Sequence, residues 1–356
     1  MTAVASEKGF TLVELLIASL VTLTVMGIAV GTFSNALALK EAALQMADAS
    51  QNLRAGSNLL VKDLLQVGRD MPRGGIAIPS GVGATAIHRP GPPNESYTFD
   101  DEAVVVSALT TGEGMGAEVN DRPTDLITLL TVDPYLPPLT LDPPNAGGSG
   151  PKYAAAGDSF DVGTNTLWIT GDPENGIAPI KAGDLVYFQA IQNTLQTVTQ
   201  VTSTTVSFGP SDPFNLNQPG ADAGSITQVL SNLGATAVTA RRVFMSTYFV
   251  YEDTPGVPRL MRRLNFFPPQ ALAGVIEALD VSYDLADGTY NPVAVKSLPY
   301  SANDVTYSEN QIRKVNLHIG VRSEFKSPKS NDYLRNHVST SLSLRNLAFV
   351  SRYDTE

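Results

Sequence analysis

The longest apolar run of the chain extends from Phe10 to Leu39, and Glu14 is its one charged residue. About 20 apolar residues are enough for a helix to cross a bilayer, and this run is longer. At about 1.5 Å per residue it would form a helix roughly 45 Å long. The pattern therefore predicts a helix that is apolar on every side over Phe10–Leu39.

Beyond this run the pattern becomes one-sided. Apolar residues recur on one face at Leu39, Ala43, Met46, Leu53, Leu60, Leu64 and Val67, and charged residues occupy the other face at Lys40, Glu41, Asp48, Arg54 and Lys62. Gly68 and Pro72 then give a helix stop signal. We expect one helix from about Phe10 to Val67 whose second half packs its stripe on a sheet of the same chain. Ser50 and Ser57 in the seam make a coiled-coil partner a weak alternative.

After Pro72, short β-branched and aromatic runs alternate with turns rich in Gly and Pro. The candidate strands are Ala103–Leu109, Asp125–Val132, Thr166–Thr170, Asp184–Ala190, Gln196–Thr202, Thr205–Phe208, Val243–Glu252, Arg259–Asn265, Ala278–Asp284, Lys314–Arg322 and Thr340–Arg345. The turn at Thr254, Pro255 and Gly256 should make a hairpin of the two runs that flank it. With no repeat and no βαβ pattern, the chain is predicted to be α+β: a long N-terminal helix packed on a β-rich, antiparallel-sheet head.

Charge and composition narrow the classes of function. The chain has a net charge of −11, and between Glu95 and Ala240 there are 17 acidic and 3 basic residues. Such a segment repels phosphate backbones, so we expect no direct nucleic-acid partner. Gln311–Glu356 is basic, with 8 basic and 4 acidic residues. The chain has no cysteine, which excludes disulfides and thiolate chemistry and is compatible with a head outside the cytoplasm.

The front of the apolar run carries a second pattern, E-K-G-F-T-L-V-E-L-L from Glu7 to Leu16. A secretory signal peptide has an apolar stretch of about 7–15 residues closed by an A-x-A-like site, and neither feature is present here. A plain signal anchor explains the length of the run but not its front. A carboxylate inside an apolar helix costs several kcal/mol unless it is paired, so Glu14 is a functional candidate.

This front resembles the prepilin signal, in which a short polar leader ending in Gly precedes F-T-L-V-E-L-L. The resemblance implies that a membrane-embedded prepilin peptidase cuts between Gly9 and Phe10 and methylates the new amine of Phe10. It also implies that Glu14 pairs in the assembled filament with the Phe10 amine of a neighbouring subunit. Opposite charges offset each other's desolvation when they meet closely. A Glu14 that reaches the membrane surface without a partner is the alternative.

Gly27 and Gly31 form a small-xxx-small pair within the apolar run. This spacing lets helices approach closely in an apolar medium, and each glycine weakens its own helix by about 1 kcal/mol. We therefore take the two glycines as helix-packing candidates, with a chance placement of small residues as the alternative.

Several segments of the head share a second pattern of apolar and polar residues: Thr124–Thr128, Ala182–Val186, Tyr248–Tyr251, Leu260–Arg263, Val275–Tyr283, Val315–Ser323 and Ser341–Asn346. Together they resemble the PilW-type minor pilins, which are related to the J-type pseudopilins of type II secretion. Each one is degenerate, and their order and spacing carry the resemblance. It implies a subunit that joins other minor pilins and primes filament growth, supporting adhesion, twitching or DNA uptake.

The sequence gives little support to catalysis or metal binding. His88, His318 and His337 are far apart and form no H-E-x-x-H pattern. Acidic turns at Asp172 and Glu174 and at Asp284 and Asp287 offer oxygen ligands, but neither has the spacing of an EF-hand. We expect no enzyme activity, no cofactor and no metal site, with a calcium site in one of the acidic turns as the alternative.

The resulting interpretation divides the chain into a leader (1–9), a transmembrane and filament-core helix (10–39), its amphipathic continuation (40–70) and a β-rich head with Gly/Pro-rich loops (71–356). The expected function is that of a minor pilin in the inner membrane, with a single span and an extracytoplasmic head, that later enters the pilus filament or its tip. Expected partners are prepilin peptidase, other minor and major pilins, the inner-membrane assembly platform and membrane lipid. The alternatives are a J-type pseudopilin and a single-pass anchored enzyme or binding protein.

Overall fold

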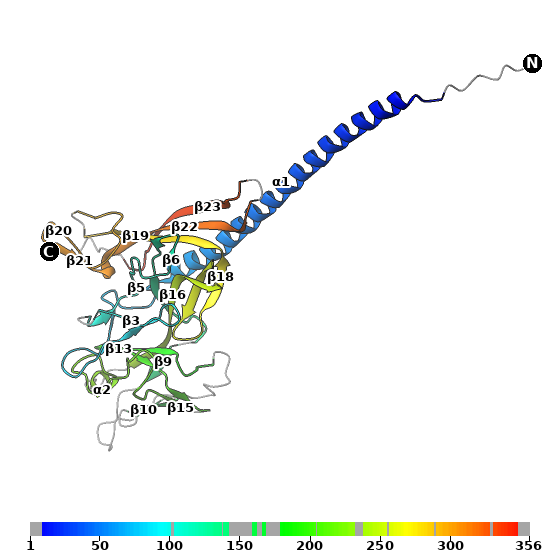
Figure 1. Cartoon of the computed structure of the whole chain (residues 1–356). Helices are drawn as coiled ribbons and strands as arrows, with labels where there is room; N and C mark the ends of the chain where they lie inside the picture. Colours follow the sequence, from blue (N-terminus) through cyan, green and yellow to red (C-terminus); the bar gives the residue numbers. More distant parts are fainter. Residues whose placement is uncertain are drawn as a thin grey trace, which may run out of the picture.

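The computed structural model describes residues 9–100, 103–136, 138–141, 159–161, 166–168, 179–203, 205–231, 238–254, 256–287, 290–327 and 330–347. One long helix projects from a β-rich head, and only its C-terminal half is packed against that head (Figure 1). The fold is α+β, as the sequence predicts.

Two α-helices, α1 Leu12–Gln66 and α2 Ile226–Ser231, and the 3₁₀ helix Glu309–Gln311 are described. The strands are β1 Ile76–Ala77, β2 His88–Arg89, β3 Tyr97–Thr98, β4 Val105–Val106, β5 Leu109–Thr110, β6 Glu118–Val119, β7 Arg122–Pro123, β8 Ile127–Val132, β9 Leu139–Leu141, β10 Ser159–Asp161, β11 Thr166–Trp168, β12 Leu185–Gln189, β13 Asn193–Thr197, β14 Gln200–Val201, β15 Thr205–Ser207, β16 Val238–Thr254, β17 Val257–Leu264, β18 Gln270–Gly274, β19 Ile276–Leu285, β20 Tyr300–Ala302, β21 Val305–Tyr307, β22 Ile312–Lys326 and β23 Tyr333–Ser343.

Helix α1 ends where the sequence predicts, because Gly68 adopts a left-handed conformation (φ +70°) that favours glycine. The buried stripe is shorter than predicted. Leu53, Leu60 and Leu64 are buried, but Leu39 and Ala43 at the start of the repeat are exposed. Ala49 is the first fully buried residue of α1, so the apolar periodicity begins before the part of the helix that the head buries.

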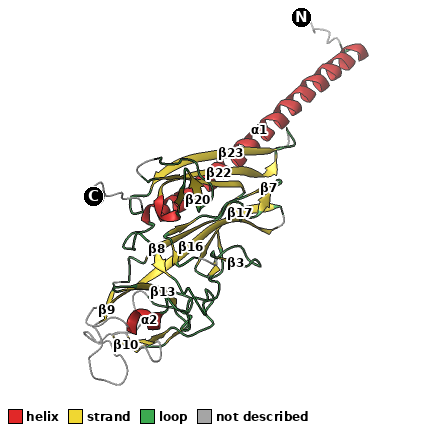
Figure 2. Cartoon of the chain, turned by 90° about the vertical axis from the view of Figure 1, so that its left-hand side faces the viewer, coloured by secondary structure: helices red, strands yellow, loops and turns green. Residues whose placement is uncertain are grey.

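The strands form two main antiparallel sheets. The larger has the order β13-β12-β16-β17-β18, with β5, β8 and β9 attached through β8 and β16, and the smaller has the order β19-β22-β23. The predicted hairpin is present as β16 and β17, whose register pairs Val250 with Leu260. A further sheet, β10-β11-β15-β14, lies with β13 and α2 at the end of the head away from α1 (Figure 2).

Two predicted strands are wrong in a similar way, because each one changes partner part of the way along. Gln196–Thr202 divides into β13 and β14, which belong to different sheets, and at the break Thr199 donates to the carbonyl of Ser207. Ala103–Leu109 divides into β4, which pairs with β1, and β5, which pairs with β8. Residue preference along the chain does not reveal such a change of partner.

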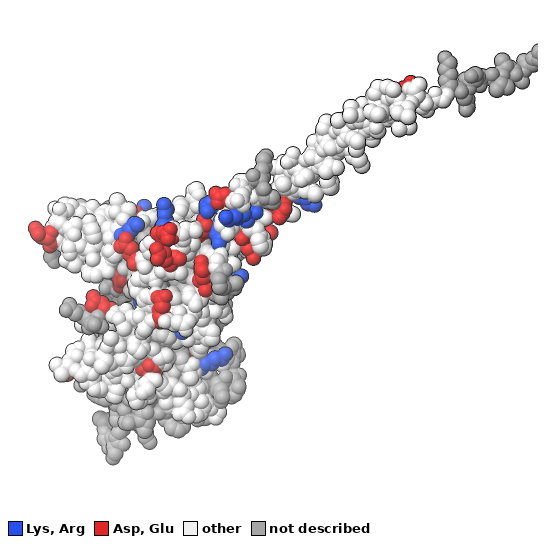
Figure 3. All heavy atoms as spheres, viewed as in Figure 1, with Lys and Arg blue, Asp and Glu red and all other residues white. Residues whose placement is uncertain are grey.

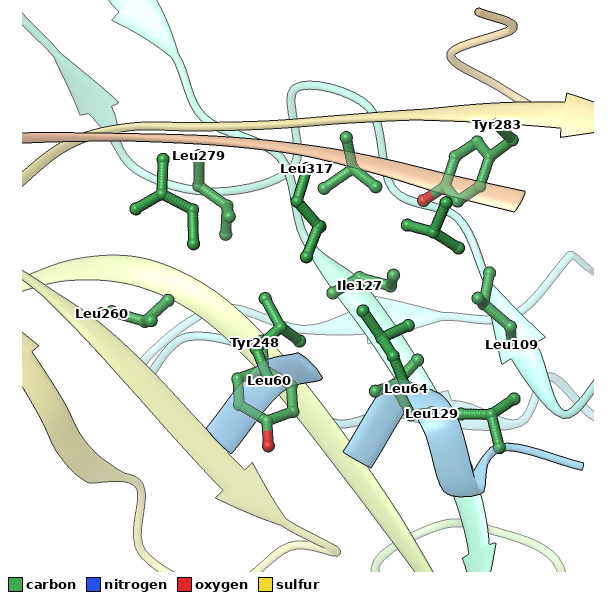
Figure 4. Packing of buried hydrophobic residues seen from close by; sticks show 14 of the residues in the cluster. Leu60, Leu64, Leu109, Ile127, Leu129, Tyr248, Leu260, Leu279, Tyr283 and Leu317 are labelled. Carbon is green, nitrogen blue, oxygen red and sulfur yellow. The ribbon is translucent and has the colours of Figure 1, made fainter. Parts of the chain in front are cut away.

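The main hydrophobic core forms where α1 meets both main sheets. Leu60 and Leu64 of α1 contact a cluster that includes Tyr248 and Leu260 of the large sheet and Leu317 of the small one (Figure 4). The helix approaches closely at Gly56, where an added Cβ would lie 2.9 Å from the Cβ of Ala273. The head therefore holds the second half of α1 as a central packing element and leaves the first half free.

Candidate functional site

The residues of the expected cleavage site lie just ahead of the helix. Gly9 and Phe10 precede Thr11, the N-cap residue, whose backbone is extended (φ −79°, ψ 151°). Phe10 is 88% exposed. The bond between Gly9 and Phe10 is therefore open to attack without any unwinding of α1. The remainder of the predicted leader, residues 1–8, lies outside the described residues.

Glu14 closes the first turn of α1 as part of a capping box. Its Oε2 accepts hydrogen bonds from the Thr11 backbone N–H at 2.9 Å and from the Thr11 hydroxyl at 3.0 Å. In return, Thr11 Oγ1 accepts from the Glu14 backbone N–H at 3.3 Å. Donors that a helix start leaves without partners are thereby satisfied, and the negative charge lies at the positive end of the helix dipole.

These hydrogen bonds use Oε2 of Glu14, and none of the described residues forms an ion pair with its charge. In an apolar environment such a charge is stabilised by a cation at close range. An ammonium group approaching Oε1 could pair with it and leave the capping box intact. The pairing predicted between Glu14 and the Phe10 amine joins two chains, and it stays a prediction.

The apolar half of α1 is uncovered in the isolated chain. Residues 9–37 are all exposed, and α1 is long and apolar enough to cross a membrane. In the space-filling view this half is uncharged apart from one acidic group near its start (Figure 3). A helix that is apolar on every side has to be covered by lipid or by other helices.

Four hydroxyl side chains of this half form hydrogen bonds within the helix itself. The hydroxyls of Ser19, Thr22, Thr24 and Thr32 each donate to the carbonyl three or four residues earlier, at 2.8–2.9 Å. Such bonds remove the cost of carrying a hydroxyl into an apolar medium. The sequence signal for these bonds was a set of single Ser and Thr residues between apolar neighbours, and no role was predicted for them.

Gly27 and Gly31 lie one helical turn apart on the same face of α1. An added Cβ at either position would meet nothing within 4 Å, and the helix continues through both. The face is therefore free for close approach by another helix. The proposed packing role needs a second chain and stays a prediction.

A buried polar contact fastens the second half of α1 to the head. Asp63 is only 8% exposed; its Oδ2 accepts a hydrogen bond from the Tyr248 hydroxyl at 2.5 Å and forms an ion pair with Arg262 Nη2 at 3.0 Å. Burial raises the pKa of the Tyr248 hydroxyl well above its usual range, and the Asp63 charge raises it further, so the hydroxyl remains a donor. The sequence signal for this contact was an aspartate within the apolar stripe, beside Leu64.

Arg89 and Arg242 are buried cations of the head with structural partners. Arg242 of β16 donates to Asp133 through Nε at 2.8 Å and lies 3.4 Å from Asp184, joining the ends of β8 and β12. Arg89 donates to the Thr128 hydroxyl and to two backbone carbonyls, and burial lowers its pKa to about 10. These groups fix loops to strands, and none of them lies on the exposed half of α1.

The histidines are not as separate as the sequence suggests. His318 and His337 lie on neighbouring strands with ring centroids 5.4 Å apart, and His318 Nδ1 is 2.9 Å from the Ser339 hydroxyl. His88 lies elsewhere, against the carbonyl of Pro213. Within the described ranges no three His, Asp or Glu side chains are grouped to hold a metal ion.

The second acidic turn is engaged by protein donors. Asp284 Oδ1 accepts from the backbone of Ala294 and from the Asn316 amide, and Asp287 Oδ2 accepts from the Tyr307 hydroxyl at 2.6 Å. Asp172 and Glu174, in the first acidic turn, lie outside the described residues.

Comparison with known proteins gives one match. A family model of the prokaryotic N-terminal methylation motif matches residues 5–30, which include Gly9, Phe10, Glu14 and Gly27. No curated protein and no solved structure matches the chain. The motif supports a pilin-like or pseudopilin-like protein that prepilin peptidase processes and that associates with other pilins, and the exposed apolar helix supports membrane anchoring.

Proposed function

We propose that this chain is a minor pilin of a type IV pilus, most similar to the PilW type, that helps to prime filament assembly. Its work is assembly rather than catalysis. The observation that carries the proposal is the methylation motif on a helix whose first half is wholly exposed and whose second half is built into a large β-rich head.

The physical basis is the transfer of one apolar helix between two apolar surroundings. Before assembly, lipid covers the exposed half of α1; in the filament, neighbouring helices cover it instead. Because both environments are apolar, the hydrophobic effect does little to oppose this transfer. The Glu14 carboxylate distinguishes the two states, since a neighbour's Phe10 amine is available only in the filament and favours it through a close ion pair.

The first test concerns processing. The mass of the N-terminal peptide isolated from cells should correspond to a chain that begins at methylated Phe10. A chain that begins at Met1, or that is cut near residue 40, would reject the pilin-like class and favour a single-pass anchored protein or a secreted one.

The second test separates assembly from processing. Glu14→Ala and Glu14→Leu should leave cleavage after Gly9 intact and reduce incorporation into filaments. Gln51→Ala is the matched control, because it removes an exposed polar side chain from the same helix beyond the apolar run. Normal piliation in both Glu14 variants would contradict the charge-pairing account.

The choice of machine rests on the head segments. Neighbouring genes for pilus components would support the minor-pilin proposal, whereas neighbouring genes for type II secretion components would replace it with a J-type pseudopilin.

A further inference from the structure

A groove lies at the neck of the molecule, where α1 leaves the head. Its walls are α1 between Glu41 and Asn52, the start of β17, the β18–β19 junction and Arg322–Phe325 of β22, and its volume is about 410 Å³. This volume is within the range of about 300–1,000 Å³ that ligand pockets have. We call it the neck groove. Charged side chains of both signs gather on this part of the surface (Figure 3).

The lining of the neck groove is amphiphilic. Leu44 and Phe325 are 55% and 65% exposed on its two walls, although each is a large apolar side chain. The charged lining residues are the cations Arg259 and Arg322 and carboxylates that include Glu41. A ligand that complements these walls carries an anionic group, a cationic group and an adjoining apolar part.

Arg322 marks the anion-binding wall. It is only 7% exposed, its Nε lies 3.3 Å from Glu277, its Nη2 donates to the Gly256 carbonyl at 2.6 Å and its guanidinium stacks on Tyr333 at 3.9 Å. Its Nη1 is buried and has no hydrogen-bond partner among the residues that the structure describes. A buried donor without a partner is costly, so an acceptor from a ligand would stabilise it.

A second polar group of the groove is also buried without a hydrogen-bond partner among the described residues. Gln45 Oε1, on the α1 wall, is buried and has no partner, while the amide nitrogen of Gln45 reaches Glu41 only at 3.5 Å. A small shift of side chains on binding would satisfy both the donor of Arg322 and this acceptor. The opposite walls of the neck groove therefore offer an unused donor and an unused acceptor.

The position of the groove along α1 places it near a membrane surface. The first charged residues at the two ends of the apolar run are Glu14 and Lys40, which are 26 residues or about 39 Å apart along the helix. A bilayer is about 40–45 Å thick including its headgroup layers. If Glu14 lies in one headgroup layer, Lys40 lies in the other, and Glu41 at the mouth of the neck groove lies beside it.

We propose that the neck groove binds the headgroup of an amine-bearing phospholipid from the leaflet out of which the head emerges. The phosphate oxygens accept hydrogen bonds from Arg322, the ammonium group lies near the groove's carboxylates, and Phe325 and Leu44 contact the methylene groups of the headgroup. Such a contact holds the head at a fixed height and orientation before assembly. The inference rests on the membrane crossing by α1 that the proposed function requires.

The absence of cysteine from the chain gives a direct test, because one introduced cysteine can be labelled uniquely with a nitroxide. Phe325→Cys, Val25→Cys and Ile191→Cys would each be labelled in the full chain. Each would be placed as a single copy in nanodiscs of phosphatidylethanolamine and phosphatidylglycerol. Val25 is in the middle of the apolar run, and Ile191 is an exposed residue of the β12–β13 turn in the head.

Accessibility to oxygen and to a water-soluble nickel chelate gives the depth of each label. We expect residue 25 in the hydrocarbon, residue 325 at the headgroup level and residue 191 in water. If the label at residue 325 is as accessible to the chelate as the label at residue 191, while the label at residue 25 is in lipid, the lipid site is wrong. The membrane anchoring by α1 is then still supported. A label at 25 that is in water overturns the anchoring as well.

Lipid retention tests the headgroup chemistry. Native mass spectrometry of the full chain in detergent with phosphatidylethanolamine should show one retained lipid. Arg322→Gln and Phe325→Ser should each weaken retention about tenfold or more, because a hydrogen bond to a charged group or a buried apolar contact is lost. Ile191→Ser is the matched control, because it also removes an exposed apolar side chain but lies away from the neck groove. Equal retention by all four proteins, or competition by inorganic phosphate alone at the same concentration as lipid, overturns the proposal.

Discussion

The contact between Asp63 and the β16–β17 hairpin joins α1 to the head, and its contribution to the free energy of unfolding can be estimated. Asp63 accepts a hydrogen bond from Tyr248, which is fully buried, and forms an ion pair with Arg262, whose side chain is 24% exposed. Replacing Asp63 by Ala therefore leaves a buried hydroxyl without an acceptor and a cation that water reaches only in part. We expect Asp63→Ala to lower the free energy of unfolding by about 3–5 kcal/mol, the cost of breaking a buried charged pair.

Tyr248→Phe should cost less, about 1.5–3 kcal/mol, because it removes one hydrogen bond to a charged acceptor and leaves the pair of Asp63 and Arg262 in place. The double variant should cost less than the sum of the two, since each single variant already breaks the shared bond. Lys62→Ala is the matched control, because Lys62 is the exposed neighbour of Asp63 on α1, and its effect should stay within about 0.5 kcal/mol.

The assay is urea unfolding of the full chain in detergent, followed by near-ultraviolet circular dichroism of the tyrosines. This signal reports on the head, whereas the apolar half of α1 stays helical in the micelle. With a slope of about 3 kcal/mol per M, a loss of 3 kcal/mol lowers the midpoint by about 1 M. If Asp63→Ala unfolds at the same urea concentration as Lys62→Ala, the account of this contact is wrong.

Two further predictions concern the head. Gly224 has a left-handed backbone (φ +72°), and an added Cβ would lie 2.2 Å from the Ile78 carbonyl oxygen. Gly224→Ala should therefore lower the free energy of unfolding by about 1–3 kcal/mol or more, measured as a lower melting temperature. Gly220→Ala is the control and should leave the melting temperature unchanged, because its added Cβ would meet nothing within 4 Å. Burial raises the pKa of the Glu309 carboxyl despite a hydrogen bond from Thr111. The folded state therefore binds this proton more tightly than the unfolded state. The stability of the natural protein relative to Glu309→Gln should be greatest below about pH 4 and fall as pH rises through the raised pKa. Parallel stability curves for the two proteins from pH 4 to 7 would contradict the assignment.

Much of the candidate assembly site could be predicted from the sequence because its determinants are local. Gly9, Phe10 and Glu14 lie within six residues, and the capping box of Thr11 and Glu14 is formed between residues three apart. The neck groove could not be predicted in this way. Its walls come from positions near 45, 258, 275 and 323, and Arg322 looks like any other charged residue that ends a strand pattern.

The sequence by itself determined the long helix, its apolar first half and its stop at Gly68, since each depends on a sum over neighbouring residues or on one local backbone preference. It also determined the β16–β17 hairpin, because a short turn fixes which strands pair. Only the tertiary structure decided where the head begins to cover α1, which strands change sheets and which residues meet Asp63. Tyr248 lies 185 positions from Asp63, and such a contact depends on how the whole chain packs rather than on any pattern near either residue.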